Sequence, residues 1–248
     1  MIFGVIIYMF ILLFSSQVMR GVMEEKSSRI VEIIITSISP VKFMAGKIIG
    51  IAFLGLTQIV CWLIIMYSFT LLISNGLDMS SSGDFMNQHN SQENINQILS
   101  NLILIDFNTI IPLFLYFFIG GFLLYSSLFA ALAATSNHSD DIQQAKLVVT
   151  LPLILSILVF SNTINSPDSA LSYWFSLIPF TSPIIMMGRV VYGAPIHEVL
   201  LSMAILAATV ILVIWLSGKV YRTAILYTGK KVTMKEIITW IKKTNKIQ

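Results

Sequence analysis

Long apolar runs alternate with short polar segments along the whole chain. A helix needs about 20 apolar residues to cross the roughly 30 Å hydrocarbon core of a bilayer. Five runs reach or approach this length, and we predict that each is a transmembrane helix: Ile2–Val22, Ile48–Ile73, Ile110–Ala134, Leu147–Ile164 and Val199–Leu216. The pattern therefore predicts an all-α, polytopic membrane protein.

A further apolar stretch, Tyr173–Tyr192, contains Pro179, Pro183 and Gly188. Proline removes a helix hydrogen bond and kinks the chain, so this stretch is poorly suited to a straight span. We expect a re-entrant helical hairpin over 173–192 that enters the bilayer from the outer face without crossing it.

The composition agrees with a membrane protein. The chain has 248 residues, of which 56% are hydrophobic and only 11% are charged, whereas soluble domains carry about 25% charged residues. The single cysteine, Cys61, lies in a predicted span and has no internal disulfide partner. The three histidines show no metal-ligand spacing. We expect no metal, no other cofactor and no nucleic-acid partner.

The basic residues predict the orientation, because Lys and Arg concentrate on the cytoplasmic side. Of the 15 basic residues, five lie in 20–47 and eight in 217–248, whereas the loop 74–109 has none. We therefore expect a multi-pass protein of the cell membrane with its N-terminus outside and its C-terminus in the cytoplasm. Residues 1–218 form the predicted transmembrane domain, and the basic tail 219–248 is expected to lie on anionic membrane lipids.

The cytoplasmic segment 21–47 is longer than a connecting loop requires. Its charged and apolar residues recur at helical spacing, and Glu25 and Arg29 form a favourable i,i+4 pair. We predict a helix there that ends at Pro40, although an ordinary positive-inside loop is the alternative. The candidate contact residues for a partner are Glu24, Glu25, Arg29, Glu32, Ile33, Pro40 and Lys42.

The run EEKSSRIVEIIITSISPVKFMAGKIIG resembles the coupling segment of ABC type-2 export permeases, in particular the sodium-efflux branch. The runs NHSDDIQQAKLVVTLPLIL and SLIPFTSPIIMMGRVVYG, and the tail through LYTGK, resemble later parts of the same family in the same order. The resemblance implies a permease that exports a sodium ion, drug, peptide or lipid-like substrate. It also implies pairing with itself or a sister permease, and a separate ATP-binding subunit that contacts the coupling segment.

The chain itself has no phosphate-binding loop of the form GxxxxGK[ST], so we expect it not to be an enzyme. The family usually starts with an extra span and an outer domain, whereas this chain begins directly at the element that follows them. The resemblance therefore implies a shortened version, a fragment, or a missing part carried by another chain.

Polar side chains within the predicted spans are the remaining indication of a substrate. Gln58, Tyr125 and Ser126 are candidates for lining a translocation path, and helix–helix hydrogen bonds are the alternative. No acidic residue lies deep in a predicted span, where it would mark an ion path. A lipid-like substrate therefore fits as well as sodium. Arg189 is expected to pair with Asp168 or Glu198, or to face lipid headgroups.

Two other functions remain open. Glu24-Glu25-xxx-Arg29 and Phe85-xxx-His89 also fit motifs of CPBP-type intramembrane proteases. Such enzymes need the glutamates and the histidine on one side of the membrane, whereas we expect them on opposite sides. A non-transporting membrane anchor or immunity factor is the third reading.

Overall fold

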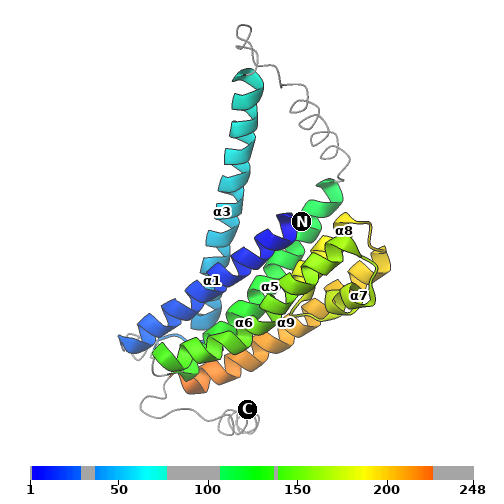
Figure 1. The fold of residues 1–248 in the computed structure, drawn as a ribbon. Coiled ribbons are helices and arrows are strands. Elements are labelled where there is room, and N and C mark those ends of the chain that lie inside the picture. Colours follow the sequence, from blue (N-terminus) through cyan, green and yellow to red (C-terminus); the bar gives the residue numbers. More distant parts are fainter. Residues whose placement is uncertain (1, 29–36, 77–106, 137–138, 226–248) are drawn as a thin grey trace. The chain divides into compact units, whose positions relative to one another are not determined.

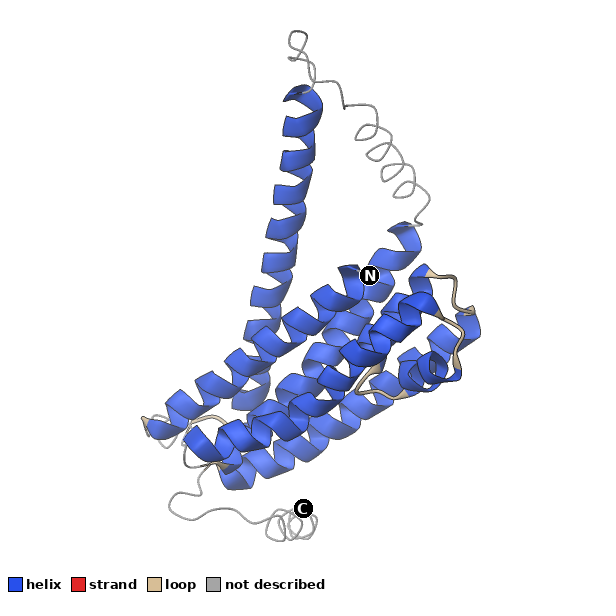
Figure 2. Ribbon diagram, viewed as in Figure 1, coloured by secondary structure: helices blue, strands red, loops and turns tan. Residues whose placement is uncertain are grey.

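The structure is a computed structural model that describes residues 2–28, 37–76, 107–136 and 139–225. Every regular element in these ranges is an α-helix (Figures 1 and 2). The helices are α1 (Ile2–Ser27), α3 (Pro40–Gly76), α5 (Phe107–Thr135), α6 (Ser139–Asn165), α7 (Ala170–Leu177), α8 (Ser182–Val191) and α9 (Ile196–Ala224). This confirms the predicted all-α class.

Five of these helices are long and apolar enough to cross a membrane, namely α1, α3, α5, α6 and α9. They overlap the five predicted spans, so the prediction of a polytopic membrane protein is confirmed. The first helix continues beyond the predicted end at Val22 to Ser27. Its last turn contains Glu and Lys, which are good helix formers and can continue a helix where apolar residues stop.

The chain divides into two compact units, residues 1–52 with 113–248, and residues 53–112. The described part of the second unit is the later part of α3 and the start of α5. In the first unit, the short helix α8 packs against α1, α6, α7 and α9.

The two short helices occupy the stretch for which the sequence predicts a helical hairpin. With eight residues in α7 and ten in α8, neither can cross a bilayer. Helix α7 begins at Ala170, before the predicted start at Tyr173, because Ser169 caps it. The Ser169 side chain accepts a hydrogen bond from the backbone N–H of Ser172. All residues of α8 from Ser182 to Arg189 are buried. Helix α8 is therefore an interior element of the first unit.

Close packing of aromatic rings holds the first unit together. Helix α5 contributes five buried rings, those of Phe114, Phe117, Phe118, Phe122 and Phe129. The ring of Phe160 on α6 lies against Gly4 of α1 and Gly188 of α8, where an added Cβ would come within 2.6 Å and 2.5 Å of it. Any larger residue at either glycine would displace this ring.

Three predicted features fall largely outside the described residues. They are the middle of the coupling segment (29–36), the central part of the loop 74–109, and the tail from residue 226 onward. The coupling helix and the placement of the tail on membrane lipids therefore remain predictions.

Candidate functional site

The structure describes both ends of the segment 21–47. Glu24 is exposed in the last turn of α1, and Lys42 is exposed in the first turn of α3. Pro40 is the first residue of α3, a position where its missing N–H costs no hydrogen bond. The other predicted contact residues, Arg29, Glu32 and Ile33, lie outside the described residues.

Glu25 joins the two ends of this segment. Its Oε2 lies 2.6 Å from Nζ of Lys47, so α1 is tied to α3 by an ion pair. Both atoms are shielded from solvent. Gly21 makes room for the lysine, because a Cβ there would lie 2.9 Å from Nζ of Lys47. The predicted pairing of Glu25 with Arg29 stays a prediction, and the carboxylate exposed at this surface is that of Glu24.

The next residue, Lys26, is buried, with 8% of its side chain exposed. Its ammonium group donates to the carbonyl oxygens of Ala134 at 2.5 Å, Ser136 at 3.2 Å and Ala224 at 3.4 Å. These carbonyls belong to the C-terminal ends of α5 and α9, which carry partial negative charge and lack helical partners. We call this group of contacts the Lys26 clamp. It holds the ends of α1, α5 and α9 together.

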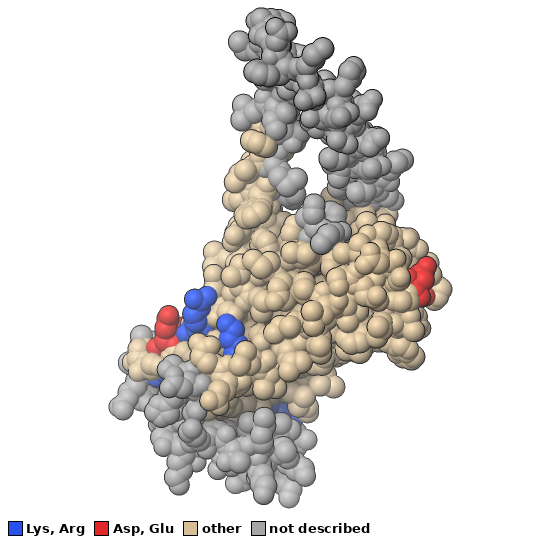
Figure 3. Space-filling view, in the orientation of Figure 1, with Lys and Arg blue, Asp and Glu red and all other residues tan. Residues whose placement is uncertain are grey.

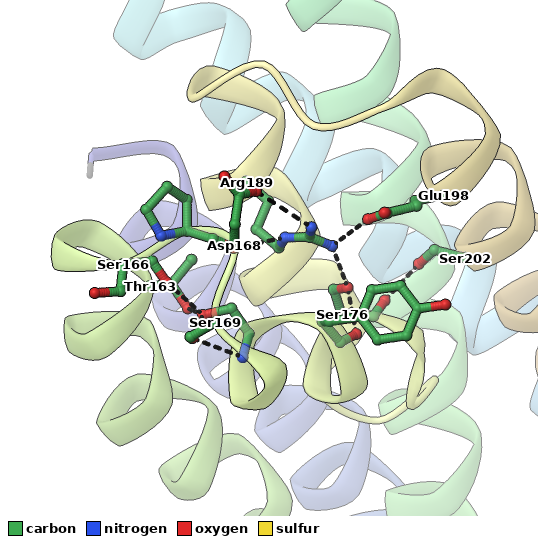
Figure 4. A network of polar contacts seen from close by, with 11 residues as sticks. Thr163, Ser166, Asp168, Ser169, Ser176, Arg189, Glu198 and Ser202 are labelled. Carbon is green, nitrogen blue, oxygen red and sulfur yellow. Dashed lines mark hydrogen bonds and ion pairs between the residues drawn. The ribbon is translucent and has the colours of Figure 1, made fainter.

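A second buried cation lies at the other end of α9. Arg189 of α8 is 3% exposed, and its Nη1 lies 2.7 Å from Oε2 of Glu198 in the first turn of α9 (Figure 4). The guanidinium also donates to Oγ of Ser176 and to the carbonyl of Pro167, both at 3.0 Å. We call this group the Arg189 clamp. It joins α7, α8 and α9 to the turn after α6.

Hydroxyl groups extend the Arg189 clamp (Figure 4). Ser202 of α9 donates to the carbonyl of Ser176 at 2.7 Å, and the hydroxyls of Thr163 and Ser172 lie 2.8 Å apart, linking α6 to α7. Of the partners predicted for Arg189, Glu198 makes the close ion pair, whereas Asp168 is 3.9 Å away and 92% exposed. The burial of Arg189 contradicts the alternative in which it faces lipid headgroups.

The two clamps are separated by the length of α9. Ala224 follows Glu198 by 26 residues, which corresponds to about 39 Å of helix. A bilayer with its headgroups is about 40–45 Å thick. On the face shown in Figure 3, the charged side chains of the described residues gather toward two ends, with uncharged surface between them. The separation of the two clamps along α9 is thus close to the thickness of a membrane.

Two of the three residues predicted to line a path, Tyr125 and Ser126, have structural contacts in the first unit. Tyr125 is buried and donates to the carbonyl of Phe180 at 2.7 Å. Ser126 is also buried, and its hydroxyl bonds to Leu123 of its own helix. Gln58 is exposed in the second unit. These contacts agree with the helix-packing interpretation, and a role in a path remains a prediction.

Sequence reasoning missed the Lys26 clamp. Its acceptors are backbone carbonyls 108 and 198 residues away, and a carbonyl has no sequence signature. The available signal is a lysine in the last turn of an apolar helix, which often meets helix C-termini. Arg189 was easier to detect because it is the single basic residue of the predicted outer hairpin.

The described residues contain no group of three or more His, Cys, Asp or Glu side chains that could hold a metal ion. Of the residues in the protease motifs, Glu25 pairs with Lys47, and His89 lies outside the described ranges.

The sequence profile described as "ABC-2 family transporter protein" matches residues 1–219. The chain is 28% identical to the "Uncharacterized protein YhaP" of Bacillus subtilis over 94% of its own length and 52% of that protein. It is 27% identical to the "Uncharacterized protein MJ1024" of Methanocaldococcus jannaschii over 95% of its length and 52% of that protein. The chain thus spans about half the length of these curated relatives. No solved structure matches it.

Permeases of this family are membrane transport components rather than enzymes, and they generally work with an ATP-binding subunit. The profile match covers almost the whole chain, and five described helices are suited to crossing a membrane. The chain therefore belongs to the ABC-2 transporter family.

Proposed function

We propose that the chain is the membrane-spanning permease of an ABC exporter in the cell membrane, driven by a separate ATP-binding subunit. The observation that carries this proposal, together with the family, is the way both ends of the segment 21–47 are fastened to the helices. Lys26 fixes the end of α1, and the pair of Glu25 with Lys47 fixes the start of α3. A force applied to this segment would therefore reach the spans.

The charge distribution supports a cytoplasmic position for this segment, where ATP is available. The basic residues around it outnumber those of every other part of the chain except the tail. Glu24 and Lys42 offer exposed charges at the two ends of the segment. With Arg29, Glu32 and Ile33 between them in sequence, they form the proposed docking surface for the ATP-binding subunit.

The spans favour an amphipathic or lipid-like substrate over sodium. In the part of the spans that the structure describes, the acidic residues Glu24, Glu25 and Glu198 all lie in end turns. An ion path through the membrane is usually marked by acidic groups deeper in the spans. A drug or peptide remains compatible with the same apolar spans. Because export permeases of this type work in pairs, we propose a homodimer or a pair with a sister permease.

Copurification tests the motor subunit directly. We expect an ATP-binding subunit to accompany the tagged chain from mildly solubilised native membranes, identified by mass spectrometry. Glu24→Lys and Lys42→Glu should each reduce its recovery, because both side chains are exposed at the proposed docking surface. Asp168→Lys is the matched control, since this exposed charge lies beside the Arg189 clamp at the other end of α9.

Glu25 is expected to behave differently from Glu24. Glu25→Lys should reduce recovery by breaking the ion pair, and Glu25→Lys combined with Lys47→Glu should restore it. If no ATP-binding subunit copurifies with the wild-type chain, the proposed transporter function is contradicted. The alternative of a non-transporting membrane anchor then replaces the transporter hypothesis.

A further inference from the structure

The geometry points to α9 as a rigid connecting rod, with Lys26 as the residue through which movement of the coupling segment enters it. Through Arg189, we propose, α9 then passes that movement to the α7–α8 hairpin. This inference rests on the proposed function, because it concerns how motion delivered to the segment 21–47 reaches the opposite end of the permease.

The first step is the input at Lys26. This residue lies two positions after the exposed Glu24, and its ammonium group reaches the carbonyls that end α5 and α9. The side chain is almost wholly buried, so it has little room to move independently of those helix ends. Displacement of the last turn of α1 would either move the C-terminal ends of α5 and α9 or break these hydrogen bonds.

The second step is transmission along α9. This helix is continuous over 29 residues, from Ile196 to Ala224, which is about 43 Å of helix. It contains no internal proline, and its one glycine, Gly218, lies near the Lys26 end. A continuous helix transmits displacement along its axis because packed, rigid elements couple distant positions.

The third step is the output at Arg189. Glu198 in the first turn of α9 pairs with Arg189 at 2.7 Å, and Ser202 one turn later bonds to the backbone of α7 at Ser176. Axial movement of α9 would therefore act on both short helices at once. These two helices are the described elements too short to cross a membrane, and we expect them at its outer edge. They are suited to opening or closing that end of a path.

The two buried cations have different geometries that match these roles. Lys26 binds backbone carbonyls, whose positions follow the helix ends whatever side chains surround them. Arg189 binds a carboxylate, a hydroxyl and a carbonyl in three directions, so its position is fixed by three segments. Lys26 is thus a positioning residue that acts through α9, and its replacement should disconnect the output from the input.

The test measures input and output separately in the complex with its ATP-binding subunit. Cys61, the single cysteine, is replaced by Ser so that spin labels can be placed at chosen sites. The input pair is Ser28, near the Lys26 clamp, with Gln143 of α6, and the output pair is Leu171 of α7, near the Arg189 clamp, with the same Gln143. All three positions are exposed, and α6 provides the reference in both pairs. Distances are measured by electron-electron double resonance without nucleotide and with ATP and vanadate.

In the otherwise unchanged complex, both distances should shift on vanadate trapping. In Lys26→Met the input shift should persist and the output shift should disappear, whereas Lys26→Arg should retain both because it keeps a charged donor. Arg20→Met is the matched control, an exposed basic residue on the same helix, and should leave both shifts intact. If Lys26→Met does not fold, Lys26→Gln keeps a neutral donor and should give a reduced output shift.

An output shift that persists in Lys26→Met, or that is undiminished in Lys26→Gln, would overturn the connecting-rod inference while leaving the proposed function intact. The same conclusion follows if the wild-type input pair moves and its output pair does not. If no ATP-binding subunit copurifies with the wild-type chain, the proposed function fails first, and the inference fails with it.

Discussion

A single arginine stabilises the packing of α7 and α8 against the N-terminal end of α9. Arg189 is 3% exposed, and its charge is compensated chiefly by Glu198. Removing one member of a buried ion pair leaves an uncompensated charge and costs about 3–5 kcal/mol, even where the intact pair adds little net stability. The unequal exposure of its two carboxylate neighbours provides an internal comparison.

We predict that Glu198→Ala markedly lowers the unfolding temperature in detergent, because it strands the buried guanidinium, whereas Asp168→Asn changes it little. The Asp168 contact is 3.9 Å long, and the Asp168 side chain is 92% exposed. Ion pairs exposed to solvent contribute about 0–1 kcal/mol. Thermal unfolding of the detergent-solubilised protein, monitored by size-exclusion chromatography, measures the unfolding temperatures of both variants. Equal losses for the two variants would show that Arg189 is compensated by its other contacts.

Pairs of helices are held by side-chain hydrogen bonds to backbone carbonyls. Tyr125 of α5 bonds to Phe180, in the turn between α7 and α8. Hydrophobic run length predicted the long helices because each span needs a minimum number of apolar residues. The same reasoning could not predict the start of α7, which is set by the Ser169 cap, or any contact whose acceptor is a carbonyl.

We expect Tyr125→Phe to destabilise the protein by about 0.5–1.5 kcal/mol, because the carbonyl of Phe180 loses the donor of a part-buried hydrogen bond. Ser126→Ala should cost less, since that hydroxyl bonds within its own helix. Thermal unfolding compares the two, and substrate export by the same variants separates packing from a role in the path. If Tyr125→Phe keeps its stability but loses export, the path interpretation would replace the packing one.

For the whole molecule, the sequence predicted the number of spans and, for Arg189, both carboxylate neighbours. The positive-inside pattern further predicts that the two clamps lie at opposite membrane faces. The Lys26 clamp remained hidden because it depends on three helix ends meeting, which is a property of the tertiary structure.

Opposite faces can be checked by labelling. In a Cys61→Ser background, cysteine at Ser28 should react with a membrane-impermeant maleimide in inside-out vesicles, and cysteine at Asp168 in intact cells. Both positions are exposed in the structure. Labelling of both positions from the same side would contradict the proposed orientation and place the segment 21–47 away from an ATP-binding subunit.

Synthesis order gives the two clamps a consequence for biogenesis. Lys26 emerges from the ribosome 198 residues before Ala224, and Arg189 emerges before its partner Glu198. Until α9 has been made and inserted, both cations lack partners supplied by this helix, and burying them would be costly. The packing of the preceding helices is therefore completed only when α9 has been inserted and contributes to both clamps. A chain stalled before α9 would display two cations without the contacts that α9 supplies, namely the Ala224 carbonyl for Lys26 and the Glu198 carboxylate for Arg189, and membrane quality control could recognise this state.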